Sequence, residues 1–464
     1  MGLKRRDFLR AGACIALGGA GVHTALGNLR LLEATTRAYG PKAFSDYKAL
    51  VCVFLLGGND AMNTVIPYDT TSYQRYAQAR ATLAVPRANL LPLTPQAGGG
   101  ASDGSQYAIQ ASTGSGDTIG AGGLQQLFNS GRMAILGNVG TLIRPVSKAD
   151  YLANRVELPP QLFSHNDQQT YWQVSAANTD TGWGGRIADL LHDANPDAFI
   201  PLSTSLNYGS QLLSGNAHHY VVGNGGPRGF SYLEWDQDVR RAYLALNADN
   251  PQAHPFERNL AASFRRAREN GFAVRDALDS ASPLQTAFPD NDLAAQLKMV
   301  ARMIQVRQVL GLKRQIFYVA VGHFDHHDYL LDDHPVLLAQ VSKALHAFHA
   351  ATVEMGLANS VTTFTASDFG RTLSSNGDGS DHGWGAHHLV IGGAVRGGRF
   401  YGTMPVLQND GPDAAEGGRM IPTTAVDQYG ATLARWFGVA ETDLDLVFPN
   451  LRNFASRNVG FMAS

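Results

Sequence analysis

Five side chains able to bind a metal ion stand beside short apolar runs of this sequence. They are Asp60, Asp325, His327, Asp368 and His382. Nine of the fifteen histidines also lie between His323 and His388. Carboxylates that converge on one place repel each other and resist ionisation unless a cation offsets their charge. Mixed Asp and His ligation suits zinc, manganese or iron better than calcium, so the pattern predicts a site for one or two such divalent ions.

Two of these aspartates have simpler explanations. An aspartate after a strand is often a turn residue or a helix N-cap, which would account for Asp60. Asp368 is followed three residues later by Arg371, which could be its salt-bridge partner. The metal hypothesis therefore depends on the cluster as a whole rather than on any single member.

The segment Phe-Ser-His-Asn-Asp-Gln-Gln contains Ser164 and His165, a second pair of candidate catalytic residues. A serine hydroxyl becomes a nucleophile when a metal ion or a base takes up its proton. The alternative, which the sequence slightly favours, is a helix N-terminus with Ser164 as cap and Asp167 three residues later. Arg371 or Arg186 could hold an anion through paired hydrogen bonds.

These residues need a scaffold that brings distant parts of the chain together, and the apolar runs predict a sheet. The runs are rich in Val, Ile, Phe and Leu without polar alternation, as expected of strands covered on both faces. We predict strands at 50–56, 133–137, 316–321, 361–365 and 389–391. Helical patterns occupy 337–355 and parts of 257–312. This alternation predicts an α/β fold with helices on both faces of a mostly parallel sheet, whose carboxyl edge binds ligands.

Two segments depart from this alternation within an expected α/β domain of residues 41–464. Residues 97–123 are dominated by Gly, Ser, Ala and Thr, and predict a flexible surface loop. Residues from about 208 to 312 carry no strong strand signal, and predict a helical cap or insertion.

The first thirty residues have the layout of a bacterial export signal. Four basic residues among the first ten precede a Gly- and Ala-rich apolar stretch, which is too short to span a bilayer. The pair Arg5-Arg6, followed by Asp-Phe-Leu, resembles a twin-arginine signal. We expect residues 1–30 to be read by the twin-arginine translocase and removed, leaving a periplasmic or extracellular protein without a stable membrane anchor.

Composition narrows the classes of partner. The 464 residues carry a formal net charge of −2, so nothing favours a nucleic acid or an anionic membrane. Only Cys52 would remain after removal of the signal, so an internal disulfide is excluded and stability must come from the core.

Several motifs resemble those of the bacterial family called domain of unknown function 1501. The first is Val-Phe-Leu-Leu-Gly-Gly-Asn-Asp-Ala-Met-Asn, from Val53 onward. Further motifs follow in the family's order at 164–168, 182–186, 324–327, 367–372 and 381–385. Twin-arginine signals are usual in that family. It is placed in the alkaline-phosphatase-like superfamily, so the resemblance implies a mostly parallel sheet with a metal site at its carboxyl edge.

The resemblance also implies roles for single residues. It gives metal-binding positions to Asp60, Asp325, His327, Asp368 and His382, and places Ser164 where the superfamily keeps its nucleophile. Two departures stand out: Phe369 replaces a histidine that binds metal in many superfamily enzymes, and Asp325 and His327 are two residues apart where phosphatases usually show four.

The sequence therefore predicts an exported, metal-dependent hydrolase. Its substrate would be a small-molecule or polymer ester carrying phosphate, sulfate or a related anionic group. The alternative, motivated by the two departures, is a non-catalytic secreted binding or assembly protein that keeps the hydrolase fold.

Overall fold

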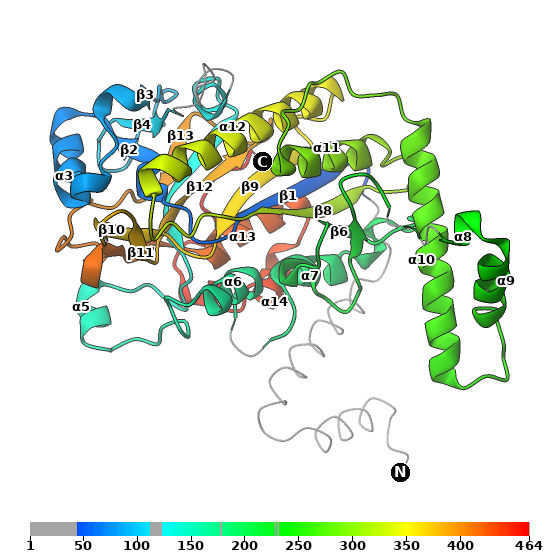
Figure 1. Cartoon of the computed structure of the whole chain (residues 1–464). Coiled ribbons are helices and arrows are strands. Elements are labelled where there is room, and N and C mark those ends of the chain that lie inside the picture. Colours follow the sequence, from blue (N-terminus) through cyan, green and yellow to red (C-terminus); the bar gives the residue numbers. More distant parts are fainter. Residues whose placement is uncertain (1–43, 112–122, 177–178, 228, 230–231, 464) are drawn as a thin grey trace, which may run out of the picture.

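The computed structural model describes residues 44–111, 123–176, 179–227, 229 and 232–463 (Figure 1). The predicted export signal at residues 1–30 lies outside these ranges. Within them, no helix combines the length and the apolar character that crossing a membrane requires.

A nine-stranded mixed sheet forms the centre of the molecule, in the order β13-β5-β12-β9-β1-β8-β6-β7 with β16 beside β5. The strands are β1 (Lys48–Leu55), β5 (Met133–Gly140), β6 (Ser203–Leu206), β7 (Tyr220–Val222), β8 (Arg314–Val321), β9 (Val361–Ser367), β12 (Ala386–Ile391), β13 (Arg399–Gly402) and β16 (Thr424–Ala425). All five predicted strands belong to it, so the α/β prediction is confirmed. The sheet is mostly parallel, but β12 runs antiparallel to both β5 and β9.

Helices cover both faces of this sheet (Figure 1). One face of β1, from Ala49 to Leu55, packs with α4 (Leu124–Asn129), α11 (Asp292–Gln305) and α12 (Leu330–Glu354). The other face, with Leu50 and Phe54, packs with α6 (His165–Val174), α7 (Trp183–Leu190) and α13 (Val426–Phe437). Successive side chains of a strand point to opposite faces, so burying both requires the unbroken apolar run that β1 has.

The prediction of a flexible loop at 97–123 is wrong for part of that segment. Residues Tyr107–Gln110 form a buried strand, β4, which pairs with β2 (Val65–Pro67) and β3 (Leu90–Pro92). Tyr107 and Ile109 pack into the main core, and burying these two side chains outweighs the Gly/Ser-rich context around them. Residues 112–122 lie outside the described residues.

The region from 208 to 312 contains more than a helical insertion. Its strand β7 extends the sheet edge beside β6, which the sequence analysis did not foresee. Its helix α11 packs on the sheet as part of the core. The remaining helices are α8 (Tyr232–Trp235), α9 (Gln237–Leu246) and α10 (Pro255–Ser280), which Figure 1 shows beyond the end of the sheet.

Further elements complete the fold. They are α3 (Thr70–Arg80), α5 (Lys148–Leu152), α14 (Leu444–Val447), β10 (Arg371–Ser375), β11 (Ser380–His382), β14 (Ala414–Ala415) and β15 (Arg419–Met420). Strands β10 and β11 form an antiparallel pair that opposes Arg371 to His382.

Candidate metal centre

Three neighbouring strands end level with one another at the carboxyl edge of the sheet. Leu55 of β1 pairs with Val321 of β8 and with Ser367 of β9. The segments that follow carry Gly57, Asp325 and Asp368, which therefore meet although they are far apart in the sequence.

Gly57 makes this meeting possible. Its φ is 115°, and a Cβ atom there would lie 2.5 Å from the backbone nitrogen of Asp325. Its own N–H donates to Asp368 Oδ1 at 3.2 Å. A larger residue would push the loop after β1 away from the loop after β8, so the close approach requires glycine.

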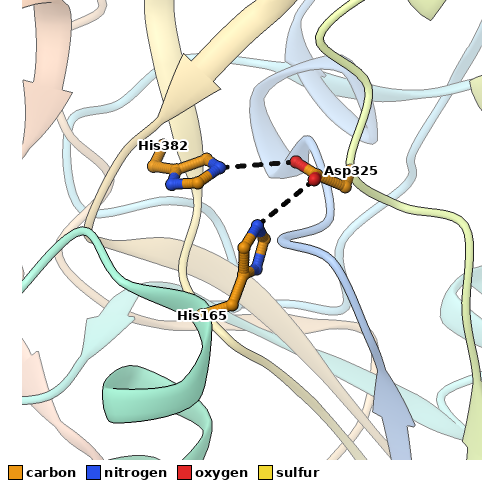
Figure 2. Close-up of side chains that lie close together, drawn as sticks. All are labelled: His165, Asp325 and His382. Carbon is orange, nitrogen blue, oxygen red and sulfur yellow. Dashed lines mark ion pairs between the residues drawn. The ribbon is translucent and has the colours of Figure 1, made fainter.

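The side chains of His165, Asp325 and His382 converge at this edge (Figure 2). One possible ligand atom from each lies within 4.8 Å of those of the other two. His165 Nε2 is 3.3 Å from Asp325 Oδ2, and His382 Nε2 is 3.5 Å from Asp325 Oδ1. His327 joins them, with Nε2 at 3.1 Å from Asp325 Oδ1 and 2.9 Å from His382 Nε2.

The protonation of His382 is set by a backbone carbonyl. Its Nδ1 lies 2.7 Å from the carbonyl oxygen of Phe163, which can only accept a hydrogen bond. Nδ1 therefore carries the hydrogen, and in the neutral ring Nε2 turns its lone pair toward Asp325. Burial lowers the pKa of His382 and so favours that neutral ring. Metal-binding histidines are commonly fixed in this way by an acceptor behind the ring.

His165 is oriented in the same manner by Asp368. Its Nδ1 lies 2.7 Å from Asp368 Oδ2, which also accepts a hydrogen bond of 2.7 Å from Gln169 Nε2. The hydrogen bond to Asp368 raises the pKa of His165. Its Nε2 is buried and makes no hydrogen bond, yet it faces Asp325. A buried nitrogen left without a hydrogen-bond partner beside a carboxylate fits a bound cation.

Arg371 keeps Asp325 in its ionised form. Burial alone would raise the pKa of Asp325, but the hydrogen bond and charge of Arg371 outweigh this and hold that pKa below its usual range. Arg371 Nη1 donates to Asp325 Oδ1 at 2.7 Å and to the carbonyl oxygen of Gly57 at 3.3 Å. The alternative of an Asp368–Arg371 salt bridge is therefore wrong, because Arg371 pairs with Asp325.

Neither arginine predicted to hold an anion is free to do so. Arg371 is fully buried and also donates to the carbonyl oxygen of Ser380. Arg186 is buried and donates to the carbonyl oxygens of Val174 and Val447. The guanidinium groups of both residues donate hydrogen bonds to other parts of the protein, so both residues have a structural role.

Asp60 stands apart from the predicted ligand cluster. It is fully buried and forms an ion pair with Arg80, which is fully buried as well. Its Oδ1 accepts from the backbone N–H of Asn63, capping a short 3₁₀ helix at Ala61–Asn63. The alternative of a turn or cap residue is thus confirmed for Asp60.

Ser164 occupies the N-cap position of α6, as the alternative for this segment proposed. Its side chain makes no capping hydrogen bond to the helix. The hydroxyl instead donates to Asp167 Oδ2 at 2.6 Å, so its proton faces a carboxylate rather than the ring of His165.

Two residues of the site were not foreseen in these roles. Gln169 lies four residues after His165 on α6, a spacing that puts both on one helix face and could have revealed it. Phe369 packs its ring on His165 and His382, with centroid distances of 4.9 and 4.7 Å. It thus supports the histidine rings from the position where a histidine was expected.

The loop carrying Asp325 and His327 is bracketed by two strained residues. His323 and Tyr329 have φ of 73° and 52°, a region that residues other than glycine seldom adopt. Such strain is concentrated at functional sites, where the surrounding structure maintains it.

Fold and site together define an α/β protein with an Asp/His centre, suited to a metal ion, at the carboxyl edge of its sheet. The sequence profile of the family described as "Protein of unknown function (DUF1501)" matches residues 47–418, and the chain belongs to that family. The resemblance found from the motifs is therefore confirmed. No curated protein sequence matches the chain.

Two solved structures share a distant likeness with the chain. One is Ps i-CgsB in complex with k-i-k-neocarrahexaose, with 10% sequence identity and a TM-score of 0.33 over 89% of this chain and 78% of that one. The other is PsFucS1 sulfatase from Pseudoalteromonas sp., with 12% identity and a TM-score of 0.28 over 90% of this chain and 72% of that one.

Proposed function

We propose that this protein is an exported, metal-dependent hydrolase of a phosphate, sulfate or related anionic ester. One observation carries the proposal: His165 Nε2 is buried without a hydrogen bond, is oriented from behind by Asp368, and faces Asp325 and His382. This is the arrangement of a metal ligand, and a residue in a purely structural ion pair does not require it.

In this proposal His165, Asp325 and His382 hold a divalent ion, with His327 as a fourth ligand. A zinc, manganese or iron ion bound there would supply Lewis-acid polarisation of an ester oxygen. Asp368 and the hydrogen bond of its partner Gln169 keep the ring of His165 aimed at the ion. Because Arg371 and Arg186 are engaged by the protein, the negative charge of the substrate would be met by the cation.

The attacking group is water or Ser164. Asp167 Oδ2 already accepts a hydrogen bond from the hydroxyl of Ser164, so a base for this serine is in place. The variant Ser164→Ala separates the two cases, because it abolishes turnover only if the serine attacks. Metal content stays unchanged in both cases, because Ser164 is not among the ligands.

Elemental analysis of protein purified without chelator or affinity-tag metal tests the proposal. We expect about one equivalent of zinc, manganese or iron, lost in Asp325→Asn and in His165→Gln. The matched control His218→Gln changes an exposed histidine elsewhere and should keep its metal. Turnover across a panel of phosphate and sulfate esters should follow metal content. Folded protein with neither metal nor turnover would refute the proposal and favour the non-catalytic alternative.

Export is supported by the sequence of residues 1–30. Replacing Arg5 and Arg6 by lysine should leave the protein in the cytoplasmic fraction, since the translocase reads the arginine pair. Unchanged delivery to the periplasm or medium would contradict this part of the proposal.

A further inference from the structure

The arm formed by residues 235–272 has almost no core of its own. It comprises the end of α8, all of α9 and most of α10, and Figure 1 shows α9 on the side of α10 away from the sheet. None of the ten residues of α9 is buried. In the 26-residue helix α10 the buried residues are Val274, Ala277 and Leu278, all near its C-terminal end. Helix α10 is about 39 Å long, at ~1.5 Å per residue; its first turns extend beyond the body, while the part from Ser263 onward lies beside it.

Hydrogen bonds and an aromatic contact join α9 to α10. The hydroxyl of Tyr243 donates to the carbonyl oxygen of Phe264 at 3.0 Å, and the two rings meet edge to face at 6.3 Å. Arg265 donates to the carbonyl oxygen of Asn247, at the end of α9. An isolated helix of ten residues is marginal in water, so α9 needs further packing to be stable.

Exposed apolar side chains are concentrated on this arm. Eight of the seventeen large apolar side chains that are exposed among the described residues belong to it. They are Trp235 (83% exposed), Val239, Leu244, Leu246 (82%), Phe256 (79%), Leu260 (60%), Phe264 and Phe272. Large aromatic side chains bury roughly 150–250 Å² each, so together these eight offer an area on the order of the ~800 Å² per partner that a stable interface buries.

Further exposed apolar residues lie on the body, at a cavity beside the arm. An open cavity of about 760 Å³ lies beside α10, where Ser263, Ala267 and Gly271 face the edge of the sheet. Exposed Phe199 and Val221 line the opposite wall. Large areas of exposed apolar side chain are rare on monomers and mark interaction sites.

The charges on the arm favour a second copy of this chain as the partner. The arm carries both signs in near balance, with Asp236, Asp238, Asp249, Glu257 and Glu269 against Arg240, Arg241, Arg258, Arg265, Arg266 and Arg268. A two-fold interface joins one patch to itself, so it needs both signs on the same surface. A helix that binds an anionic lipid surface instead has a strongly basic polar face, whereas five acidic residues offset the six arginines of this arm.

We propose that the arm is a homodimerisation element, in which α9 and α10 of one copy pack against the same helices of a second copy about a two-fold axis. The proposal is independent of the metal centre, which is built from other elements. It accounts for a helical pair that has too little core to stand alone.

Analytical ultracentrifugation of the full-length chain at several concentrations tests this. We expect a species of twice the single-chain mass at micromolar concentration. The variant Leu246→Glu/Phe256→Glu/Leu260→Glu should be a folded monomer, with association weakened at least about tenfold by each change at the centre of the interface. The matched control Val309→Glu/Val353→Glu changes exposed apolar residues away from the arm and should remain dimeric.

Hydrogen exchange locates the contact without any substitution. Amides of α9 and the first turns of α10 should exchange faster on dilution, while amides of the central sheet should not. A wild-type monomer at tens of micromolar would overturn the proposal. So would a dimer that survives the triple substitution, or a monomer whose arm binds phospholipid vesicles.

Discussion

Two aspartates that follow adjacent strands of the sheet, Asp60 after β1 and Asp325 after β8, both meet a fully buried arginine. The Asp60–Arg80 pair is sealed, because both side chains are 0% exposed. The Asp325–Arg371 pair is open on the carboxylate side, where Asp325 is 44% exposed. Three histidines also face Asp325, through ring nitrogens at 3.1 to 3.5 Å.

This difference separates a closed ion pair from an accessible one. Both carboxylate oxygens of Asp60 are engaged within the protein. One pairs with Arg80 and the other accepts from the N–H of Asn63, so neither is open to a ligand. Asp325 is ionised by Arg371 but stays accessible, beside ring nitrogens that Phe163 and Asp368 orient. The same residue type at equivalent strand ends thus serves folding in one place and, in the proposed function, ligand binding in the other.

The largest effect is expected from breaking the sealed pair. Arg80→Met leaves the charge of Asp60 buried without compensation, which should destabilise the protein by about 3–5 kcal/mol. Arg80 also donates to the carbonyl oxygens of Thr372 and Leu373, so β10 would lose its anchor on α3. Urea unfolding followed by circular dichroism measures the change.

The double variant Asp60→Asn/Arg80→Met is the control for that prediction. It removes the uncompensated charge while the asparagine still caps the 3₁₀ helix, so most of the lost stability should return. If the single and double variants were equally destabilised, the packing of the Arg80 side chain rather than its charge would be what matters.

Acid should lower the stability of the protein partly through His334, which lies near the sealed pair and is one of several buried histidines whose pKa is lowered by burial. Burial lowers the pKa of His334 to about 3, below the value of the unfolded chain; Asp60 acts against that shift, while His326, Arg80 and Arg371 add to it. As the pH drops below about 6.5, His334 therefore becomes protonated in the unfolded state but stays neutral in the folded state. The free energy of unfolding falls as a result. At about 1.4 kcal/mol per pH unit, the loss from this residue reaches about 3 kcal/mol by pH 4.

The variant His334→Gln should flatten the fall in stability between pH 6.5 and 4, measured by urea unfolding at several pH values. The exposed His218→Gln should leave it unchanged. For His165 of the open site the sign is reversed: its pKa is raised by its hydrogen bond to Asp368, so its contribution is full below about pH 6.5 and lost as the pH rises through its folded value. An equally steep curve in His334→Gln would show that other groups control acid unfolding.

Sequence reasoning found the strand ends because they depend on local patterns. The apolar runs before Asp60, Asp325 and Asp368 were sufficient to predict strands and the edge at which they end. Pairing could not be predicted, because it depends on tertiary packing. Arg371 lies three residues from Asp368 in the chain but bonds to Asp325, 46 residues away.

The same limit explains why the strands β4 and β7 were not predicted from the sequence. The strand β4 is surrounded by Gly and Ser residues, and β7 is only three residues long. Neither has a strong pattern of its own, so each is fixed by the strand it pairs with. Arg80 was overlooked for a related reason, since nothing in α3 indicates that its last residue is buried against Asp60.

The smallest effect, and the sharpest test of the open site, is expected for Asp368→Asn. Asp368 Oδ1 accepts from Gly57 N–H, and Oδ2 accepts from His165 and Gln169. An asparagine that keeps the bond to Gly57 turns its NH₂ group toward His165 Nδ1. That ring must then accept at Nδ1 and carry its hydrogen on Nε2, where the lone pair for a metal ion is needed.

Metal affinity of Asp368→Asn, measured by chelator competition, should therefore fall about 10–100-fold, the usual cost of losing an outer carboxylate. Imidazole ¹⁵N shifts of His165 in the metal-free protein should show the exchanged tautomer. Gln169→Leu removes a donor to Asp368 but leaves the tautomer in place, so its loss of affinity should be smaller. If Asp368→Asn bound metal as tightly as the wild type, His165 would not be a ligand, and the open pair would be as structural as the sealed one.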